Sequence, residues 1–320
     1  MGHSLSFARF VEWLKIVCQR AMVFYALVFL VVNATIDYDR IYFGIKVRLV
    51  ERIFPAKFNT LILVEQQEKN PTARELMPYI NFYKRIVDYF PDQADAWSML
   101  GFCYYYLGDS FNALWDYEQA LKQQPEYFWF AFNIGTIYFR SGNFSQSIPY
   151  FEKAIKTNPD KNLEYILSSK VVYRSLLWEL PKGAEELKAR LKIGYQRSYL
   201  ALILSSYQLQ NYAAMLNYAE SALLSNVGLT SDFTYFAGLA AYKLNQWDKA
   251  LKYFEASAKQ NPQHAHTFYQ WGLTLQSLNK NKEAAAKLNQ ASELKQQLGL
   301  PVLGEPILDY LAKDIFVKIF

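Results

Sequence analysis

Apolar residues recur at helical spacing along most of the chain, and short polar turns interrupt them. The turns are "GDS" at 108–110, "SGN" at 141–143 and "NQ" at 245–246. Clusters of glycine, serine, asparagine and aspartate of this kind mark connections between elements. The chain is also rich in aromatic residues and poor in glycine and proline, which disfavours a β-sandwich full of tight turns. The pattern predicts an all-α chain of antiparallel helix hairpins.

The hairpin pattern repeats along the sequence. The period is 34 residues, and it relates Gly101 to Gly135, Tyr104 to Tyr138, Ala120 to Ala154 and Pro125 to Pro159. Gly238 and Gly272 are again 34 residues apart, and the 103 residues from Gly135 to Gly238 are three periods with one insertion. A helix hairpin cannot bury its own apolar face, so neighbouring repeats must stack to form a core. The sequence therefore predicts a solenoid.

The first complete unit matches a known repeat at every defining position. It reads Trp97-x2-Leu100-Gly101-x2-Tyr104, then Ala113-x3-Tyr117, Ala120 and Pro125. In these residues the chain resembles the tetratricopeptide repeat family, and the resemblance covers about two-thirds of the chain. It implies a right-handed superhelical α-solenoid in which Gly101 and Ala113 let two helices cross closely. Tyr117 would fill the space beside them, and Pro125 would end the second helix.

The predicted organisation has four parts. Residues 1–40 form a hydrophobic N-terminal segment, 41–93 an amphipathic helix and a partial repeat, 94–298 the repeat array, and 299–320 a C-terminal capping helix. The units of the array are 94–127, 128–161, 162–195, 196–230, 231–264 and 265–298. The third unit is degenerate, with a Pro-Lys-Gly break at 181–183, and in the fourth Ile203 replaces the glycine and Ala219 the aromatic residue. A membrane-surface contact is the alternative for the C-terminal helix.

The N-terminal segment predicts a membrane contact through residues 10–36. Residues 21–36 are uncharged and would span about 24 Å as a helix, slightly less than a bilayer core of about 30 Å. A single-pass anchor is the leading interpretation, with the repeats on the extracytoplasmic side, although the flanking basic residues are nearly balanced. A cleaved signal peptide with "VNA" at 32–34, or a buried helix, are alternatives. The basic amphipathic stretch 41–54 would lie on lipid or cap the repeats.

Composition and motifs disfavour catalysis and nucleic-acid binding. The net charge is +5 with no basic block, and the two cysteines are isolated, so neither RNA binding nor a disulfide or zinc scaffold is indicated. The nucleotide-binding and hydrolase motifs are absent from the sequence. His264 and His266 could hold a metal ion only as two ligands without a third, so a solvated pair is the expectation. We expect no enzyme activity, no cofactor and no metal.

The resemblance implies that a partner lies in a concave groove lined by the first helix of each unit. The positions carried over are Phe102, Tyr105, Trp129, Phe132, Asn133, Thr136, Phe139, Arg140, Tyr235, Leu239, Tyr242, Tyr269 and Gln276. In the family, an asparagine at the place of Asn133 often bonds the backbone of a bound peptide. The carboxylate clamp of chaperone-binding members is missing, because Ser98, Phe102, Leu163 and Leu167 occupy its places. Packing by the terminal helices is the alternative role for these aromatic residues.

These expectations combine into one leading function. It is a non-catalytic, membrane-anchored scaffold that binds a peptide or helical segment of a partner protein in an aromatic groove and helps assemble a membrane or envelope complex. A helical-repeat RNA binder of the pentatricopeptide type and a secreted adaptor released by signal cleavage are the alternatives.

Overall fold

The computed structural model describes residues 12, 15, 17–24, 72–168, 184–300 and 303. The chain divides into two units, Met1–Ala56 and Lys57–Phe320. In the first unit the described residues are helical and exposed. Within the part of the chain that the structure describes, no helix is both long and apolar enough to cross a bilayer. Most of the predicted anchor and nearly all of the predicted C-terminal cap lie outside the described residues, so those two assignments stay predictions.

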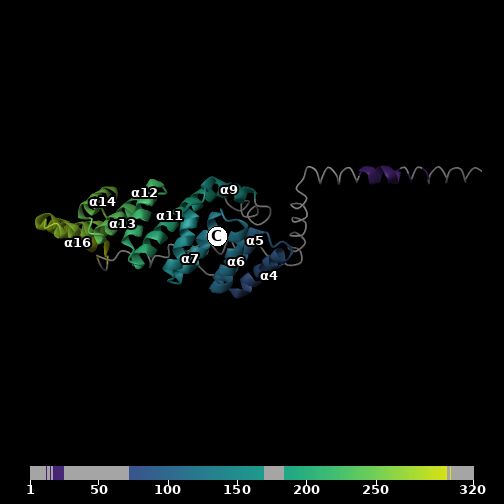
Figure 1. Ribbon diagram of the computed structural model, residues 1–320, viewed down its shortest axis with the longest axis horizontal. Helices are drawn as coiled ribbons and strands as arrows, with labels where there is room; N and C mark the ends of the chain where they lie inside the picture. Colours follow the sequence, from purple (N-terminus) through teal and green to yellow (C-terminus); the bar gives the residue numbers. More distant parts are fainter. Residues whose placement is uncertain are drawn as a thin grey trace, which may run out of the picture. The chain divides into compact units, whose positions relative to one another are not determined.

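The second unit is a series of helices that follow one another from α4 to α16 (Figure 1). Its described residues form helices and short connections and contain no strand. The helices are α4 (Ala73–Tyr89), α5 (Ala94–Tyr106), α6 (Ser110–Gln123), α7 (Phe128–Arg140), α8 (Phe144–Ile155), α9 (Pro159–Ser168), α11 (Ala184–Gln208), α12 (Tyr212–Leu224), α13 (Thr230–Lys243), α14 (Trp247–Gln260), α15 (Ala265–Ser277) and α16 (Asn281–Leu298).

Each hairpin turns at one residue in the left-handed backbone region. These residues, at equivalent repeat positions, are Gly108, Gly142, Gln210, Asn245 and Asn279, with φ of 79°, 75°, 55°, 58° and 59°. Only glycine, and to a lesser degree asparagine, adopts this conformation readily. Side chains cap the start of some of the second helices. The carboxylate of Asp109, for example, accepts a hydrogen bond from the backbone N–H of Asn112 at 3.1 Å. Local turn chemistry thus sets the predicted hairpins.

The close crossing of the paired helices depends on glycine, as predicted. A Cβ atom added at Gly238 would lie 2.7 Å from the ring of Phe254, and one at Gly101 would lie 2.9 Å from the ring of Tyr117. The same arrangement joins Gly135 to the ring of Phe151 and Gly272 to the side chain of Leu288. Phe254 is fully buried. Each pair fills one crossing, since protein interiors are close-packed.

In the fourth hairpin, α11 with α12, the small residue and the large residue of the helix crossing are exchanged between the two helices. Ile203 stands where the other first helices carry glycine, and Ala219 stands where the other second helices carry a large side chain. Both side chains are fully buried. By repeat position, the large residue and the small residue have thus changed helices in this hairpin.

The third unit departs from the predicted register. The sequence places a unit boundary at residue 195, but α11 runs through it as a single helix of 25 residues. The hydroxyls of Ser147 on α8 and Ser205 on α11 are 3.1 Å apart, and the hydroxyl of Tyr218 on α12 donates to Glu152 on α8 at 2.6 Å. The α11–α12 hairpin therefore packs directly against the α7–α8 hairpin. The sequence from 184 to 208 contains no proline, and its one glycine, Gly194, lies within the helix, so helix propagation continues across the boundary.

Candidate functional site

Most of the predicted groove residues lie inside the protein. Less than one-tenth of the residue surface is exposed for Phe102, Trp129, Phe132, Asn133, Thr136, Phe139, Tyr235 and Leu239. Phe132 and Tyr235 have no exposed surface at all. In this conformation these two rings belong to the core and cannot touch a partner. The groove as a whole stays a prediction.

The burial around α7 comes from its packing with α11. A Cβ atom added at Gly194 of α11 would lie 2.6 Å from the ring of Phe128 and 3.1 Å from the ring of Trp129. Phe132 continues this aromatic layer, because its ring centroid lies 5.4 Å from that of Phe128. Sequence analysis did not single out Gly194, since the repeat pattern assigns no helix crossing to that position. Its role depends on the continuous α11.

The predicted groove residues that stay accessible are Tyr105, Arg140, Tyr242, Tyr269 and Gln276. The guanidinium of Arg140 donates a hydrogen bond to the Tyr105 hydroxyl at 2.7 Å and lies 5.8 Å from the centre of the same ring. This contact joins α5 to α7. Part of the accessible set thus already links neighbouring repeats.

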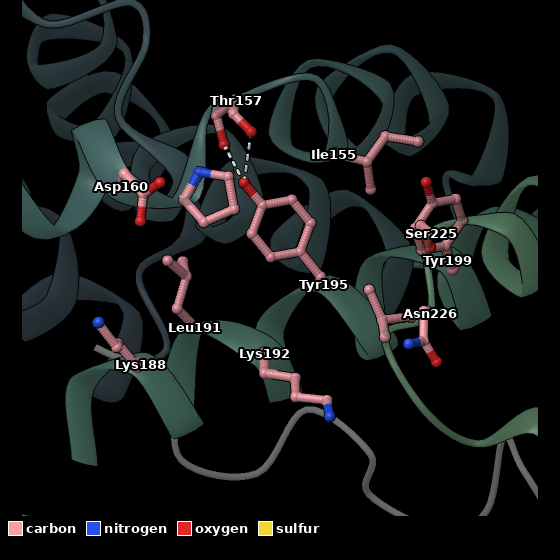
Figure 2. Close-up of a pocket in the computed structure, with 12 residues that line it drawn as sticks. Ile155, Thr157, Asp160, Lys188, Leu191, Lys192, Tyr195, Tyr199, Ser225 and Asn226 are labelled. Carbon is pink, nitrogen blue, oxygen red and sulfur yellow. Dashed lines mark hydrogen bonds between the residues drawn. The ribbon is translucent and has the colours of Figure 1, made fainter. Parts of the chain in front are cut away.

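A pocket of about 520 Å³ opens where the repeat register breaks. It lies between the end of α8, the start of α9, the first half of α11 and the connection from α12 to α13 (Figure 2). Its lining residues are Ile155, Thr157, Pro159, Asp160, Lys188, Leu191, Lys192, Tyr195, Tyr199, Ser225, Asn226 and Val227. None of these residues is in the predicted groove. The degenerate unit 162–195 was the one sequence signal close to this place.

Tyr195 fixes one side of the pocket. Its hydroxyl donates to the backbone carbonyl of Thr157 at 2.6 Å and lies 2.8 Å from the Thr157 hydroxyl (Figure 2). Burial raises the pKa of Tyr195, so the ring stays neutral at ordinary pH. This pair ties α11 to the residues that follow α8. The wall of the pocket is therefore held by tertiary contacts.

The charged side chains of the pocket are Lys188, Lys192 and Asp160. The two lysines are four residues apart on α11, hence on one face of the helix, and both are exposed. Asp160 lies in the first turn of α9. Among the ion pairs of the described residues, none involves any of the three. Their charges are free to meet a ligand.

The polar chemistry of the described residues gives no sign of a metal centre or a reactive thiol. They contain no group of three or more histidine, cysteine or acidic side chains that could hold a metal ion. Burial raises the pKa of Cys103 and keeps it a thiol. His264 directs its Nδ1 to the Thr267 hydroxyl at 2.7 Å, and its ring centroid lies 5.7 Å from that of His266. The pocket itself offers recognition groups: two cations, one anion, amide and hydroxyl groups and an apolar wall.

Comparison with known proteins agrees with the repeat pattern. Residues 131–161 and 232–264 each match a tetratricopeptide repeat family model. The chain is 36% identical over 77 residues to human "Tetratricopeptide repeat protein 6", covering 24% of this chain and 14% of that protein. It is 29% identical over 147 residues to mouse "Tetratricopeptide repeat protein 21B", covering 42% and 11%. The chain thus spans only a small part of these relatives.

Two solved structures resemble part of the chain at low identity. A crystal structure of MamA has a TM-score of 0.46 at 17% identity, covering 62% of this chain and 96% of that one. A crystal structure described as "YrrB: a TPR protein with an unusual peptide-binding site" has a TM-score of 0.49 at 17% identity, covering 67% and 92%. Hairpin geometry and the family-model matches together indicate that residues 131–161 and 232–264 are tetratricopeptide repeats. Repeats of this class are scaffolds for protein–protein interaction.

Proposed function

We propose that this protein is a non-catalytic scaffold that binds a peptide or helical segment of a partner protein. The observation that carries the proposal is the pocket at the junction between α8 and α11, in an array of repeats that bind proteins. Its volume of about 520 Å³ falls within the usual range of ligand sites, roughly 300–1,000 Å³. Such a volume suits a few side chains of a peptide.

The residues that line the pocket suit the binding of a peptide better than catalysis. Ile155, Leu191 and Val227 supply apolar surface, and Ser225 and Asn226 supply groups that can bond a peptide backbone. The accessible residues of the predicted groove, Tyr105 among them, offer further contacts for a longer segment. Few precisely placed polar groups in a mostly apolar site are typical of recognition.

Obstruction of the pocket tests this proposal. Dodecapeptides selected from a displayed random library against the intact chain should lose binding to Ser225→Trp, which places an indole at the rim. The control is Ser141→Trp. Ser141 is exposed and caps the C-terminal end of α7, just as the exposed Ser225 caps the C-terminal end of α12. Fluorescence anisotropy with the selected peptides measures the dissociation constants. A library that yields no binder would contradict the proposal. So would peptides whose dissociation constant changes with neither Ser225→Trp nor Ser141→Trp.

The membrane part of the proposal rests on sequence. An anchor through residues 10–36 would hold the repeats at a membrane on its extracytoplasmic side, where they would help assemble a membrane or envelope complex. The support is the uncharged and strongly apolar stretch 21–36. Fractionation of cells without detergent should leave the intact chain with the membranes even after a carbonate wash. Recovery of the intact chain in the soluble fraction would contradict an anchor.

A further inference from the structure

We propose that the pocket between α8 and α11 takes an acidic peptide segment, whose carboxylates meet Lys188 and Lys192. This inference rests on the proposed function, because it names the ligand chemistry of the same site. Its basis is the charge and shape of the pocket lining.

The lining carries two positive charges against one negative charge. Lys188 lies on the same side of the pocket as Asp160, which comes from the start of α9, and Lys192 extends from α11 toward the other side (Figure 2). The ion pairs recorded among the described residues leave both lysines without an acidic partner. The neighbouring Lys161 differs, because its ammonium lies 3.3 Å from Glu126. Opposite charges attract most strongly where the lysines are not already neutralised.

One contact places the end of the Lys192 side chain beside the α12–α13 connection. A Cβ atom added at Gly228 would lie 3.9 Å from the Cε of Lys192, so the lysine stem runs along the α12–α13 connection. The amide of Gln196, one turn further along α11, donates to the carbonyl of Val227 at 2.6 Å and fixes that connection. The Lys192 side chain therefore lies beside a fixed connection while it stays exposed to a ligand.

The other lining groups suit a peptide that carries an acid beside an apolar residue. Leu191 and Ile155 form an apolar wall within the same pocket, and Tyr195 stays neutral against it. Leu224, which precedes the lining residue Ser225, is 87% exposed. An acidic side chain can reach the lysines while an adjacent apolar side chain covers this wall. A cationic segment would meet repulsion from two lysines, and two lysines are few for a nucleic-acid backbone.

Charge reversal at the two lysines tests the inference. Random dodecapeptides are displayed and selected against the intact chain, and the fraction of aspartate and glutamate in the enriched pool is counted. The strongest peptide is then synthesised and titrated by fluorescence anisotropy. Lys188→Glu with Lys192→Glu should weaken its binding about tenfold or more, since two attractions become two repulsions. Asp160→Asn should strengthen it about twofold to threefold, because it removes a like charge.

The matched control is Lys252→Glu with Lys282→Glu, a double variant with the same change of net charge at exposed sites outside the pocket. All of these side chains are at the surface, so folding should be preserved, and circular dichroism with thermal unfolding checks it. A higher salt concentration should weaken the wild-type complex but leave the pocket double variant less affected.

The outcomes distinguish the proposed peptide binding from the proposed acidic character of the peptide. Acidic peptides that lose affinity only with the pocket double variant support the inference. Enriched peptides without acidic residues, or equal losses in the pocket and control variants, overturn it. If such peptides still lose binding to Ser225→Trp, the peptide-binding function stands while the acidic ligand fails. If Asp160→Asn weakens binding and the lysine variant does not, the ligand is cationic and the inference is wrong.

Discussion

The protein contains two kinds of helix crossing, one in the α13–α14 hairpin and one in the α11–α12 hairpin. In the α13–α14 hairpin, the first helix supplies Gly238 and the second supplies Phe254, whose ring fills the space. In the α11–α12 hairpin, the first helix supplies Ile203 and the second supplies Ala219. All four residues are buried, so both crossings are filled. The comparison indicates that the repeat requires a filled volume at the crossing and tolerates a change in which helix fills it.

A second comparison concerns the contacts between successive second helices. Tyr253 on α14 donates to Glu220 on α12 at 2.6 Å, across a regular junction. Tyr218 on α12 donates to Glu152 on α8 at the same distance, although 66 residues separate them. The same contact therefore forms at a junction where a whole unit of sequence intervenes. The α11–α12 hairpin packs on α8 at this junction, and the pocket lies there.

The largest expected effect comes from breaking the exchanged crossing. Ile203→Gly removes a buried side chain and adds backbone freedom, so it should lower the free energy of unfolding by about 3–5 kcal/mol. Ala219→Phe alone should overpack the same site by about 1–3 kcal/mol. The double variant restores the glycine–aromatic pair of the other hairpins. Urea unfolding should show that it is more stable than the sum of the single effects predicts, by at least about 1 kcal/mol. Simple additivity would contradict the exchange.

Asp116 allows a test through pH. It is buried, 5% exposed, and one of its carboxylate oxygens has no hydrogen-bond partner. Burial raises its pKa to about 7 from an ordinary value of 3.8, while Lys84 opposes the change. The folded state thus binds a proton more tightly than the unfolded chain, so stability is lost as pH rises from about 4 through about 7.

Asp116→Asn should remove that loss and gain on the order of 2 kcal/mol above pH 7 relative to the wild type. Thermal unfolding at pH 5 and pH 8 measures the difference. The exposed Asp92→Asn serves as control. Equal pH dependence of the Asp116→Asn variant and the wild type would count against a buried, protonated carboxyl at this position.

The regular crossing gives the next effect. Replacement of glycine by alanine within a helix usually stabilises it by about 0.5–1 kcal/mol. At Gly238 the new methyl group would lie 2.7 Å from the Phe254 ring, so we expect Gly238→Ala to destabilise the protein by about 1–3 kcal/mol. Chemical denaturation measures this change. A stabilised variant would show that the hairpin is more loosely packed than the structure indicates.

The smallest effect concerns the tyrosine contacts. Tyr218→Phe and Tyr253→Phe each remove one half-buried hydroxyl that donates to a glutamate, and each should cost about 1 kcal/mol. Near-equal losses in denaturation experiments are expected, because both hydroxyls donate to a glutamate at 2.6 Å. If only Tyr253→Phe is destabilised, the α8–α12 junction is not equivalent to the regular one.

The fold was largely predictable because its signals are local. The turn glycines, Gly108 for example, and the crossing pair of Gly101 and Tyr117 each lie within one repeat, where a sequence pattern can reveal them. The path of α11 could not be predicted in the same way. Whether a helix continues past residue 195 depends on tertiary contacts such as the close approach of Gly194 to Phe128, which are distant in sequence.

The candidate site was less predictable for the same reason. The predicted groove assigned Phe132 and Tyr235 to the surface because the repeat pattern gives positions on a helix but does not show what covers them. In the structure both rings are fully buried. Conversely, the pocket joins Thr157 to Tyr195, and no repeat period relates these two residues. Only the degenerate unit between them indicated that something differs there.

The packing of α11 against α8 is the central structural claim, and a disulfide tests it most directly. The Ser147 and Ser205 hydroxyls are 3.1 Å apart, close enough for cysteines at both positions to bond with a small adjustment. Ser147→Cys with Ser205→Cys, in a chain with Cys18→Ser and Cys103→Ala, should form one intrachain disulfide under mild oxidation, identified by peptide mass spectrometry. The pair Ser147→Cys with Ser257→Cys, whose second site lies on α14, should stay reduced. Absence of the first disulfide in the folded chain, or equal cross-linking of both pairs, would contradict the account.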